Sequence, residues 1–304
     1  MKERILRGNL YFGILLFLFA TLLLIFDSSF MKTWYYIFAW WSFILFLDSL
    51  NFRSRGISPL SEGLSNFLFM AFISVCVWLL FELFNLRLKN WSYVDFPTGT
   101  FPRWLGYFLA FATVIPALKE LSLLFQSYFG RRQLRLFRVR PTRFLLSGSV
   151  FFGILSVGGA LLWPNLCFPL VWLGFYFLIE PLNYRLKAVT LIVDFQRGEW
   201  GNFWGWIFAG LTAGFLWEFW NYWAGSHWQY SLPYLDFWRV FQMPVFGYLG
   251  FLPFALEVFA IWNLVLAVQK RVKKSVPVSV VIILVLLLFC AASFYLMDKF
   301  TVVP

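Results

Sequence analysis

The chain alternates long apolar segments with short polar ones, and the apolar segments predict its fold. Nine of them are long enough to cross a hydrocarbon layer of about 30 Å, which takes about 20 helical residues. The period-two alternation typical of membrane barrels is missing, so we expect helices to satisfy the backbone. The pattern therefore predicts an all-α, polytopic membrane protein. Its spanning helices are expected at 9–26, 31–50, 66–86, 104–126, 143–163, 166–184, 203–224, 246–268 and 277–297.

The composition agrees with this pattern. Of the 304 residues, 61% are hydrophobic, 23% are aromatic and only 13% are charged, which is too apolar for the surface of a water-soluble domain. The first apolar segment follows a basic start and resembles a secretory signal. No small-residue cleavage site follows it, however, and we expect it to remain as an anchor helix.

Basic residues gather in alternate connections between the predicted helices. Two examples are RRQLRLFRVRPTR at 131–143 and KRVKK at 270–274. The positive-inside rule then places the N-terminus in the cytoplasm and the C-terminus outside, and we expect a bacterial inner membrane. Anionic lipid headgroups attract such segments, so membrane lipids account for the net charge of +11 without a nucleic-acid partner.

The sequence contains an internal repeat. DSLNFR at 48–53 matches EPLNYR at 180–185, and FELFN at 81–85 matches WEFWN at 217–221. Further matches pair Trp91-x-Tyr93 with Trp228-x-Tyr230, and Pro116 and Glu120 with Pro253 and Glu257. We predict two parallel four-helix repeats, at 1–130 and 131–270, related by an axis along the membrane normal. An extra C-terminal helix follows at 271–304.

Six acidic residues fall in or beside the predicted spans as three repeat-related pairs. They are Asp48 and Glu180, Glu82 and Glu218, and Glu120 and Glu257. An amide follows three residues after each of the first four acids, at Asn51, Asn183, Asn85 and Asn221. On a helix this spacing places acid and amide on one face. The second and third helices of each repeat are therefore expected to present a polar stripe to the bundle interior.

The position of these acids predicts a functional site. A charged side chain at the centre of a spanning helix costs about 2.5–3.5 kcal/mol, so such residues usually face a protein interior or a cavity. Two structural explanations stay open. Asp48 and Glu180 lie near helix ends, where solvent or the nearby Arg53 and Arg185 can stabilise them. The other four acids can instead join helix to helix by hydrogen bonds.

Metal and cofactor chemistry have little support in the sequence. The only histidine is His227, and no H-E-x-x-H, aspartate-rich or glycine-rich phosphate motif is present. We predict neither a metal nor a cofactor, and no disulfide among Cys76, Cys167 and Cys290. Carboxyl groups among 71 aromatic residues (41 Phe, 17 Trp, 13 Tyr) are suited to protonating an alkene. Apolar burial favours the neutral acid, and aromatic faces stabilise a passing cation.

Three elements of the second repeat resemble a known family. WEFWNYW at 217–223, Trp228-x-Tyr230, and Pro253 closely followed by Glu257 resemble the integral-membrane lycopene cyclase domains, which occur as duplicated or heterodimeric repeats. A fainter likeness extends to membrane terpene cyclases. The resemblance implies metal-free, redox-neutral cyclisation of an isoprenoid or another lipid, as in carotenoid biosynthesis.

The resemblance also implies roles for individual residues. Glu218 and Glu257 would form an acid-base pair with Asn221 orienting Glu218, and Glu82, Glu120 and Asn85 would do the same in the first repeat. The rings expected to line the pocket are Trp217, Trp220, Tyr222, Trp228 and Tyr230.

Two other functions remain open at this point. A proton-coupled transporter also has duplicated helices and buried carboxyl groups, and it predicts a polar path to both faces. A non-catalytic membrane scaffold predicts that the acids and amides serve helix packing alone. The sequence does not indicate an oligomeric state.

Overall fold

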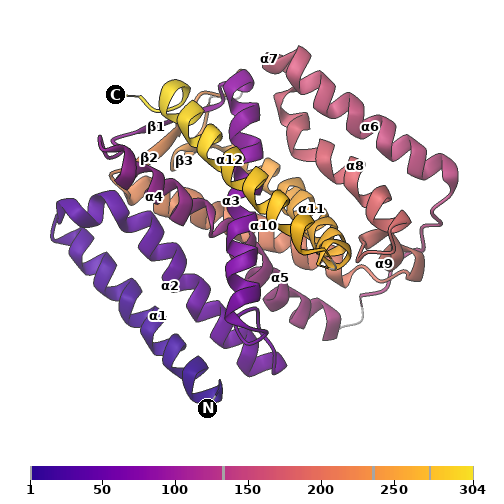
Figure 1. Ribbon diagram of the computed structural model, residues 1–304, viewed down its shortest axis with the longest axis horizontal. Coiled ribbons are helices and arrows are strands. Elements are labelled where there is room, and N and C mark those ends of the chain that lie inside the picture. The colour runs from indigo at the N-terminus through magenta and orange to yellow at the C-terminus, as the bar shows by residue number, and fades with distance from the viewer. Residues whose placement is uncertain (1, 132–133, 235–236, 274, 304) are drawn as a thin grey trace.

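The computed structural model describes residues 2–131, 134–234, 237–273 and 275–303, and they form an all-helical fold with a few short strands (Figure 1). Within these residues, seven helices are long and apolar enough to cross a membrane. They are Gly8–Ile25, Leu64–Leu88, Thr100–Gly130, Arg143–Leu162, Pro164–Arg185, Val245–Val272 and Val276–Phe300.

Two further long helices cover the other ranges predicted to span. They are α2 (Ser29–Arg55), with 27 residues, and α10 (Gly201–Trp223), with 23 residues. Both are long enough to cross a bilayer, but neither is among the seven helices named above. Their many tryptophan, tyrosine and polar side chains lower their hydropathy.

Two helical hairpins flank a central group of helices. On one flank α1 (Lys2–Ile25) packs along α2, and on the other α6 (Arg143–Leu162) packs along α8 (Val171–Arg185) (Figure 1). The short α7 (Pro164–Cys167) and η1 (Phe168–Leu170) join α6 to α8. The helix expected at 166–184 therefore begins with two separate turns.

The helix expected at 104–126 is also divided, into α4 (Thr100–Phe111) and α5 (Val114–Arg131). The Ser74 hydroxyl joins the two pieces, since it donates to the Phe111 carbonyl and accepts from the Ile115 amide. In the second half, η2 (Val245–Gly250) leads into α11 (Phe251–Val272). Pro116 and Pro253 are each the third residue of the helix after the break, where a missing N–H is tolerated.

Glycine residues on α10 allow this helix to pack closely on its neighbours. On α10, a Cβ at Gly205 would lie 2.7 Å from Gln126 Cγ on α5, and one at Gly210 would lie 2.3 Å from the Phe251 carbonyl oxygen on α11. Glycine therefore lets α10 pack closely on both neighbours. The third helix of the first half, α3 (Leu64–Leu88), has Phe69 and Ser74 at the matching positions, 136 residues earlier.

A strand pair joins the two halves at one end of the bundle. β1 (Trp91–Val94) and β2 (His227–Tyr230) pair antiparallel, with Trp91 opposite Tyr230 and Tyr93 opposite Trp228. The chain after α12 (Val276–Phe300) adds to this pair, because the Tyr93 amide donates to Thr301 and the Val303 amide donates to Tyr93. A small hairpin of β3 (Arg239–Val240) and β4 (Met243–Pro244) lies nearby in the chain. α9 (Leu191–Arg197) follows α8.

Candidate functional site

Glu218 lies near the end of α10 and is fully buried. Its Oε1 accepts a hydrogen bond of 2.8 Å from the hydroxyl of Tyr230 on β2. Its Oε2 is buried and has no hydrogen-bond partner among the residues that the structure describes. One oxygen of this carboxyl group is thus held by a single donor, and the other is left unpaired.

Glu82, at the matching position on α3, has more partners. Its Oε1 accepts from Trp78 Nε1 at 2.8 Å, from Trp91 Nε1 at 3.0 Å and from the Tyr93 hydroxyl at 2.5 Å. Trp78 lies one helical turn before Glu82, and Gly214 takes that place on α10. Within the described residues, Glu82 Oε2 also has no partner.

Burial raises the pKa of the Tyr93 and Tyr230 hydroxyls well above the ordinary value for tyrosine, and the neighbouring carboxyl groups raise it further. Both hydroxyls therefore remain protonated at neutral pH. They can serve as permanent hydrogen-bond donors to Glu82 and Glu218.

The two amides hold the strands and do not orient the acids. Asn85 Nδ2 donates to the Trp91 carbonyl, and its Oδ1 accepts from the amides of Asn90 and Trp91. Asn221 likewise bonds both the carbonyl and the amide of Trp228. We expected Asn221 to contact Glu218. Asn221 instead binds the backbone of β2, because this strand begins shortly after the end of α10 and passes beside it.

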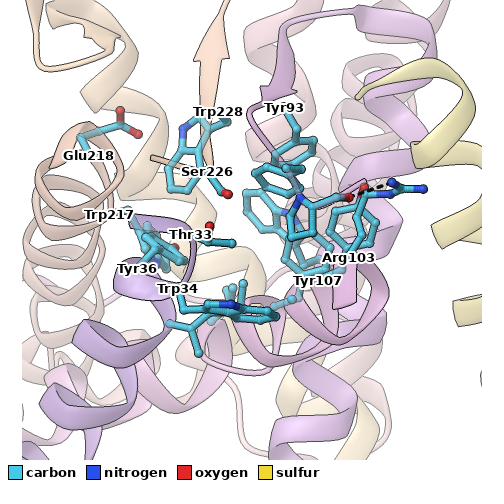
Figure 2. Close-up of a pocket in the computed structure, with 18 of the residues that line it drawn as sticks. Thr33, Trp34, Tyr36, Tyr93, Arg103, Tyr107, Trp217, Glu218, Ser226 and Trp228 are labelled. Atoms are coloured by element: carbon cyan, nitrogen blue, oxygen red, sulfur yellow. Dashed lines mark hydrogen bonds between the residues drawn. The ribbon is translucent and has the colours of Figure 1, made fainter. Parts of the chain in front are cut away.

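Glu218 forms part of the wall of a pocket with about 820 Å³ of empty space, which we call pocket A (Figure 2). Glu218 and Trp228 lie toward one side, and Tyr107 and Arg103 lie toward the other. Its walls come from α2, α3, α4, α10, the start of α5, the start of α11, and the strands with the segments beside them. The rings that line it are Trp34, Tyr36, Trp78, Tyr93, Phe96, Tyr107, Phe111, Trp217, Trp228, Tyr230 and Phe251.

The polar side chains on the far side of pocket A are already paired. Arg103 forms a two-point ion pair with Asp298 of α12, with both N···O distances 2.7 Å. Tyr107 and Trp104 also donate to Asp298. The C-terminal helix, expected only as an addition to the repeats, is thus attached to the wall of this pocket.

A second pocket, pocket B, lies beside the same strands and has about 770 Å³ of empty space. It shares Trp78, Tyr93, Trp228, Tyr230 and Phe251 with pocket A. Its other walls come from η1, α8 and η2, including Trp172 and Gly250. Glu218 lines pocket A but not pocket B, and Glu82 lines neither.

Asp48 and Glu180 stabilise the loops that follow their helices. Asp48 accepts from the Ser58 hydroxyl at 2.9 Å and from the Leu60 amide at 2.8 Å. Glu180 accepts from the hydroxyl of Thr190, 132 residues after Ser58. Both acids are buried, so these contacts replace the expected pairing with nearby arginines or solvent.

Glu120 and Glu257 lie apart from Glu218. Glu120 accepts from Asn51 Nδ2 at 2.6 Å, and Glu257 accepts from the Phe175 amide at 2.9 Å. Asn183 donates to the Ala260 carbonyl. Neither Glu120 nor Glu257 lines pocket A or pocket B. Glu218 and Glu257, which were expected to act as an acid-base pair, therefore do not share either pocket. The reason is that α11 directs Glu257 toward the backbone of α8.

Three of the five predicted pocket rings line pocket A, namely Trp217, Trp228 and Tyr230. Trp220 instead packs on Trp40 of α2, with 4.7 Å between ring centroids, and Tyr222 is 48% exposed. The helical turn directs these two rings away from the pocket. Trp34, Trp78 and Tyr107 also line the pocket, and no pattern in the sequence indicated them; Tyr93 alone carried a signal, because it matches Tyr230 in the predicted repeat.

The described residues include no group of three or more His, Cys, Asp or Glu side chains that could hold a metal ion. His227 Nδ1 lies 2.6 Å from the Gly225 carbonyl oxygen. The three cysteines are free, although Cys76 and Cys290, distant in sequence, lie with their Sγ atoms 3.7 Å apart.

Searches of protein-family models, curated proteins and solved structures found no match to this chain. The geometry therefore defines an all-helical protein with helices suited to a membrane and an aromatic pocket beside one buried acid.

Proposed function

We propose that this protein is a membrane-embedded enzyme that protonates an alkene of an isoprenoid or similar lipid in pocket A, with Glu218 as the acid. The observation that carries the proposal is the buried Glu218 Oε2, which has no hydrogen-bond partner in the described parts of the chain and belongs to a group on the wall of an aromatic pocket. An apolar surrounding disfavours the charged form of a carboxyl group. Glu218 can therefore hold a proton until an alkene carbon accepts it.

The chemistry needs no oxidant and no metal in this proposal. The proton on Oε2 adds to one alkene carbon, and a cation forms on the neighbouring carbon. A second double bond of the same molecule then forms a carbon–carbon bond to the cation, and a proton lost from an adjacent carbon returns to the carboxylate. The product is an isomer of the substrate, and Glu218 is restored.

The protein would contribute three effects to this reaction. Tyr230 holds Oε1 in place, which leaves Oε2 as the oxygen that transfers the proton. The rings of Trp217 and Trp228 can stabilise the cation through their electron-rich faces. The apolar walls exclude water, which would otherwise capture the cation as an alcohol.

The remaining acids have a structural role in this proposal. Asp48, Glu180, Glu120 and Glu257 each hold a loop or a neighbouring helix by hydrogen bonds. In this assignment the four acids serve helix and loop packing, as in the scaffold alternative, and Glu218 serves catalysis. The likeness to lycopene cyclase domains supports the reaction class but gives no role to Glu257 in pocket A.

Duplication of a four-helix unit is part of the proposal. It is supported by the strand register, in which Trp91 faces Tyr230 and Trp228 faces Tyr93. The same two residue types thus meet on both sides of a central pair, as expected about a two-fold axis. Pockets A and B lie beside this strand pair and share five residues. We further propose that α2 and α10 also span, which gives nine crossings with the N-terminus in the cytoplasm.

The decisive experiment uses purified protein in D₂O with a panel of linear isoprenoid polyenes. The carboxyl proton of Glu218 should exchange with solvent when the product leaves the pocket. The wild type should therefore convert a member of the panel to an isomer that carries one deuterium, detected by mass spectrometry. Glu218→Gln should lower turnover by about 10³-fold, in the range for loss of a general acid, while Glu82→Gln retains most of it. Equal turnover by wild type and Glu218→Gln would overturn the proposal, as would a wild type that incorporates no deuterium.

A proton-coupled transporter is the second candidate, because one more cavity opens toward the opposite end of α10, with about 1580 Å³ of empty space that includes open solvent. It is lined by Asn202 and Trp206, early in that helix, whereas Glu218 lies near its end. A transporter requires these spaces to join during a cycle. Proteoliposomes would then show proton movement that depends on a solute gradient and stops in Glu218→Gln.

A further inference from the structure

The cavity at the opposite end of the helices, which we call pocket C, has more amide side chains than the two aromatic pockets, and it also contains Lys119 and Glu62. It lies between α3, α5, α10 and α11, beside the connections before α3 and before α9. Its lining residues include Glu62, Phe69, Lys119, Phe259 and Trp262.

The difference between the two halves explains why this space is open. α10 packs closely on α5 because Gly205 has no side chain. At the matching position α3 carries Phe69, whose ring lines pocket C. α3 and α11 are not among the closely packed helix pairs. The Phe69 ring therefore keeps α3 and α11 apart, whereas a glycine at this position would allow them to pack closely.

Pocket C contains one basic and one acidic side chain. Lys119 extends from α5, and Glu62 precedes α3. No ion pair joins them at 4.0 Å or less, and neither has a side-chain hydrogen bond among the contacts of the described residues. In contrast, Gln126 donates to Asn202, and Asn202 donates to Asp194. The amide wall is thus internally paired, whereas Lys119 and Glu62 face the same space and, among the described residues, form no ion pair and no side-chain hydrogen bond.

The other wall of the pocket is apolar. Phe69, Phe259 and Trp262 line it, and Phe69 and Trp262 are neighbours, with 6.1 Å between ring centroids. The cavity therefore offers a positive group, a negative group and a hydrocarbon surface together. It lies at the end of the bundle where Arg55, Arg185 and Lys270 occupy the helix ends, a place suited to lipid headgroups.

We propose that pocket C binds the headgroup of a zwitterionic phospholipid with a primary amine. Lys119 contacts the phosphate, and Glu62 accepts hydrogen bonds from the ammonium group. The acyl chains lie along Phe69, Phe259 and Trp262. The quaternary ammonium of phosphatidylcholine has no N–H group to donate to Glu62. The headgroup of phosphatidylglycerol has no amine and offers Glu62 no positive charge. Both lipids should therefore bind more weakly. This site involves no residue of pocket A and stands independently of the proton chemistry.

The test measures lipid retention by native mass spectrometry on the full chain, delipidated in detergent. Phosphatidylethanolamine should bind at least about tenfold more tightly than phosphatidylglycerol or phosphatidylcholine. Lys119→Met should weaken all three lipids about tenfold, which corresponds to about 1.4 kcal/mol. Glu62→Gln, a change at an exposed side chain that does not threaten folding, should bring phosphatidylethanolamine to the level of phosphatidylglycerol.

The matched control is Lys32→Met. Lys32 is paired with Asp27 outside the pocket, and its loss should leave lipid retention unchanged. The proposal is overturned if Glu62→Gln keeps the preference for phosphatidylethanolamine, if Lys119→Met retains lipid like the wild type, or if the wild type does not distinguish the three lipids. Displacement of the lipid by ethanolamine and inorganic phosphate at the same concentration would identify a free polar ligand and overturn it as well.

Discussion

Glu82 and Glu218 occupy matching positions in the two halves of the molecule, and their surroundings differ in one decisive respect. Three donors, from Trp78, Trp91 and Tyr93, converge on one oxygen of Glu82. Glu218 has one donor, Tyr230, and lines pocket A. The same acid is thus fixed within packed rings in one half and borders an open space in the other.

The difference traces to the residue one helical turn earlier. Trp78 on α3 covers Glu82 and donates to it, whereas α10 has Gly214 there, and the Phe251 ring takes up the space. A Cβ at Gly214 would lie 2.1 Å from that ring. The change from Trp78 to Gly214 therefore removes one of the two indole donors. The other donor, Trp91, is matched by Trp228, whose Nε1 has no hydrogen-bond partner among the described residues. Matching sequence positions can thus have different surroundings in the two halves.

The largest effect on stability should come from removing the acceptor at Glu82. Glu82→Leu leaves three buried donors unsatisfied, at about 1–3 kcal/mol for each, so we expect a loss of at least about 3 kcal/mol. Glu218→Leu strands only the Tyr230 hydroxyl and should lose about 1–3 kcal/mol. Urea unfolding in a fixed detergent, followed by tryptophan fluorescence, measures both. Equal losses for the two variants would remove the distinction between the acids.

The close packing of α10 gives the next largest effect. Gly210→Ala places a Cβ 2.3 Å from the Phe251 carbonyl oxygen and should destabilise the protein by about 1–3 kcal/mol, as overpacking does. The matched control is Gly158→Ala on α6, where a Cβ meets no atom within 4 Å and should be neutral or slightly stabilising. Similar midpoints of thermal unfolding for the two variants would contradict the proposed packing.

The two tyrosines should differ in their effect on activity. Tyr230→Phe removes the one donor to Glu218 and should lower kcat about tenfold, or about 1.4 kcal/mol. Tyr93→Phe leaves Glu82 with two indole donors and should change kcat little. The assay is the deuterium-incorporation reaction described above. A larger loss in Tyr93→Phe than in Tyr230→Phe would show that the wrong carboxyl group was assigned.

The smallest effect tests whether Trp78 shields Glu82. An apolar carbodiimide should modify Glu218 faster than Glu82 in the wild type, as peptide mass spectrometry can determine. Trp78→Ala should raise modification of Glu82 roughly threefold, which is less than 1 kcal/mol in the barrier. Phe152→Ala on α6, an exposed position outside both pockets, is the control. Unchanged labelling of Glu82 in Trp78→Ala would mean that another group excludes the reagent.

Much of the fold was predictable, because the backbone of a long apolar segment inside a membrane must satisfy its own hydrogen bonds and does so as a helix. The turns before Val171 were not predicted, since hydropathy averages over such local breaks. The site was predicted in part. Glu218, Trp217, Trp228 and Tyr230 lie together as expected, but Glu257 faces α8, because helix rotation depends on packing that a linear pattern does not contain.

By itself, the sequence determined that helices form, that acidic residues recur at matching positions, and that rings surround them, because hydropathy and spacing are local properties of the chain. The tertiary structure alone decided which acid borders a pocket. Whether an acid borders a pocket depends on the packing around it. Gly210 and Gly214 allow α10 to pack closely on Phe251, whereas the Trp78 ring covers Glu82. Such contacts join residues of different helices, and only the folded chain brings them together.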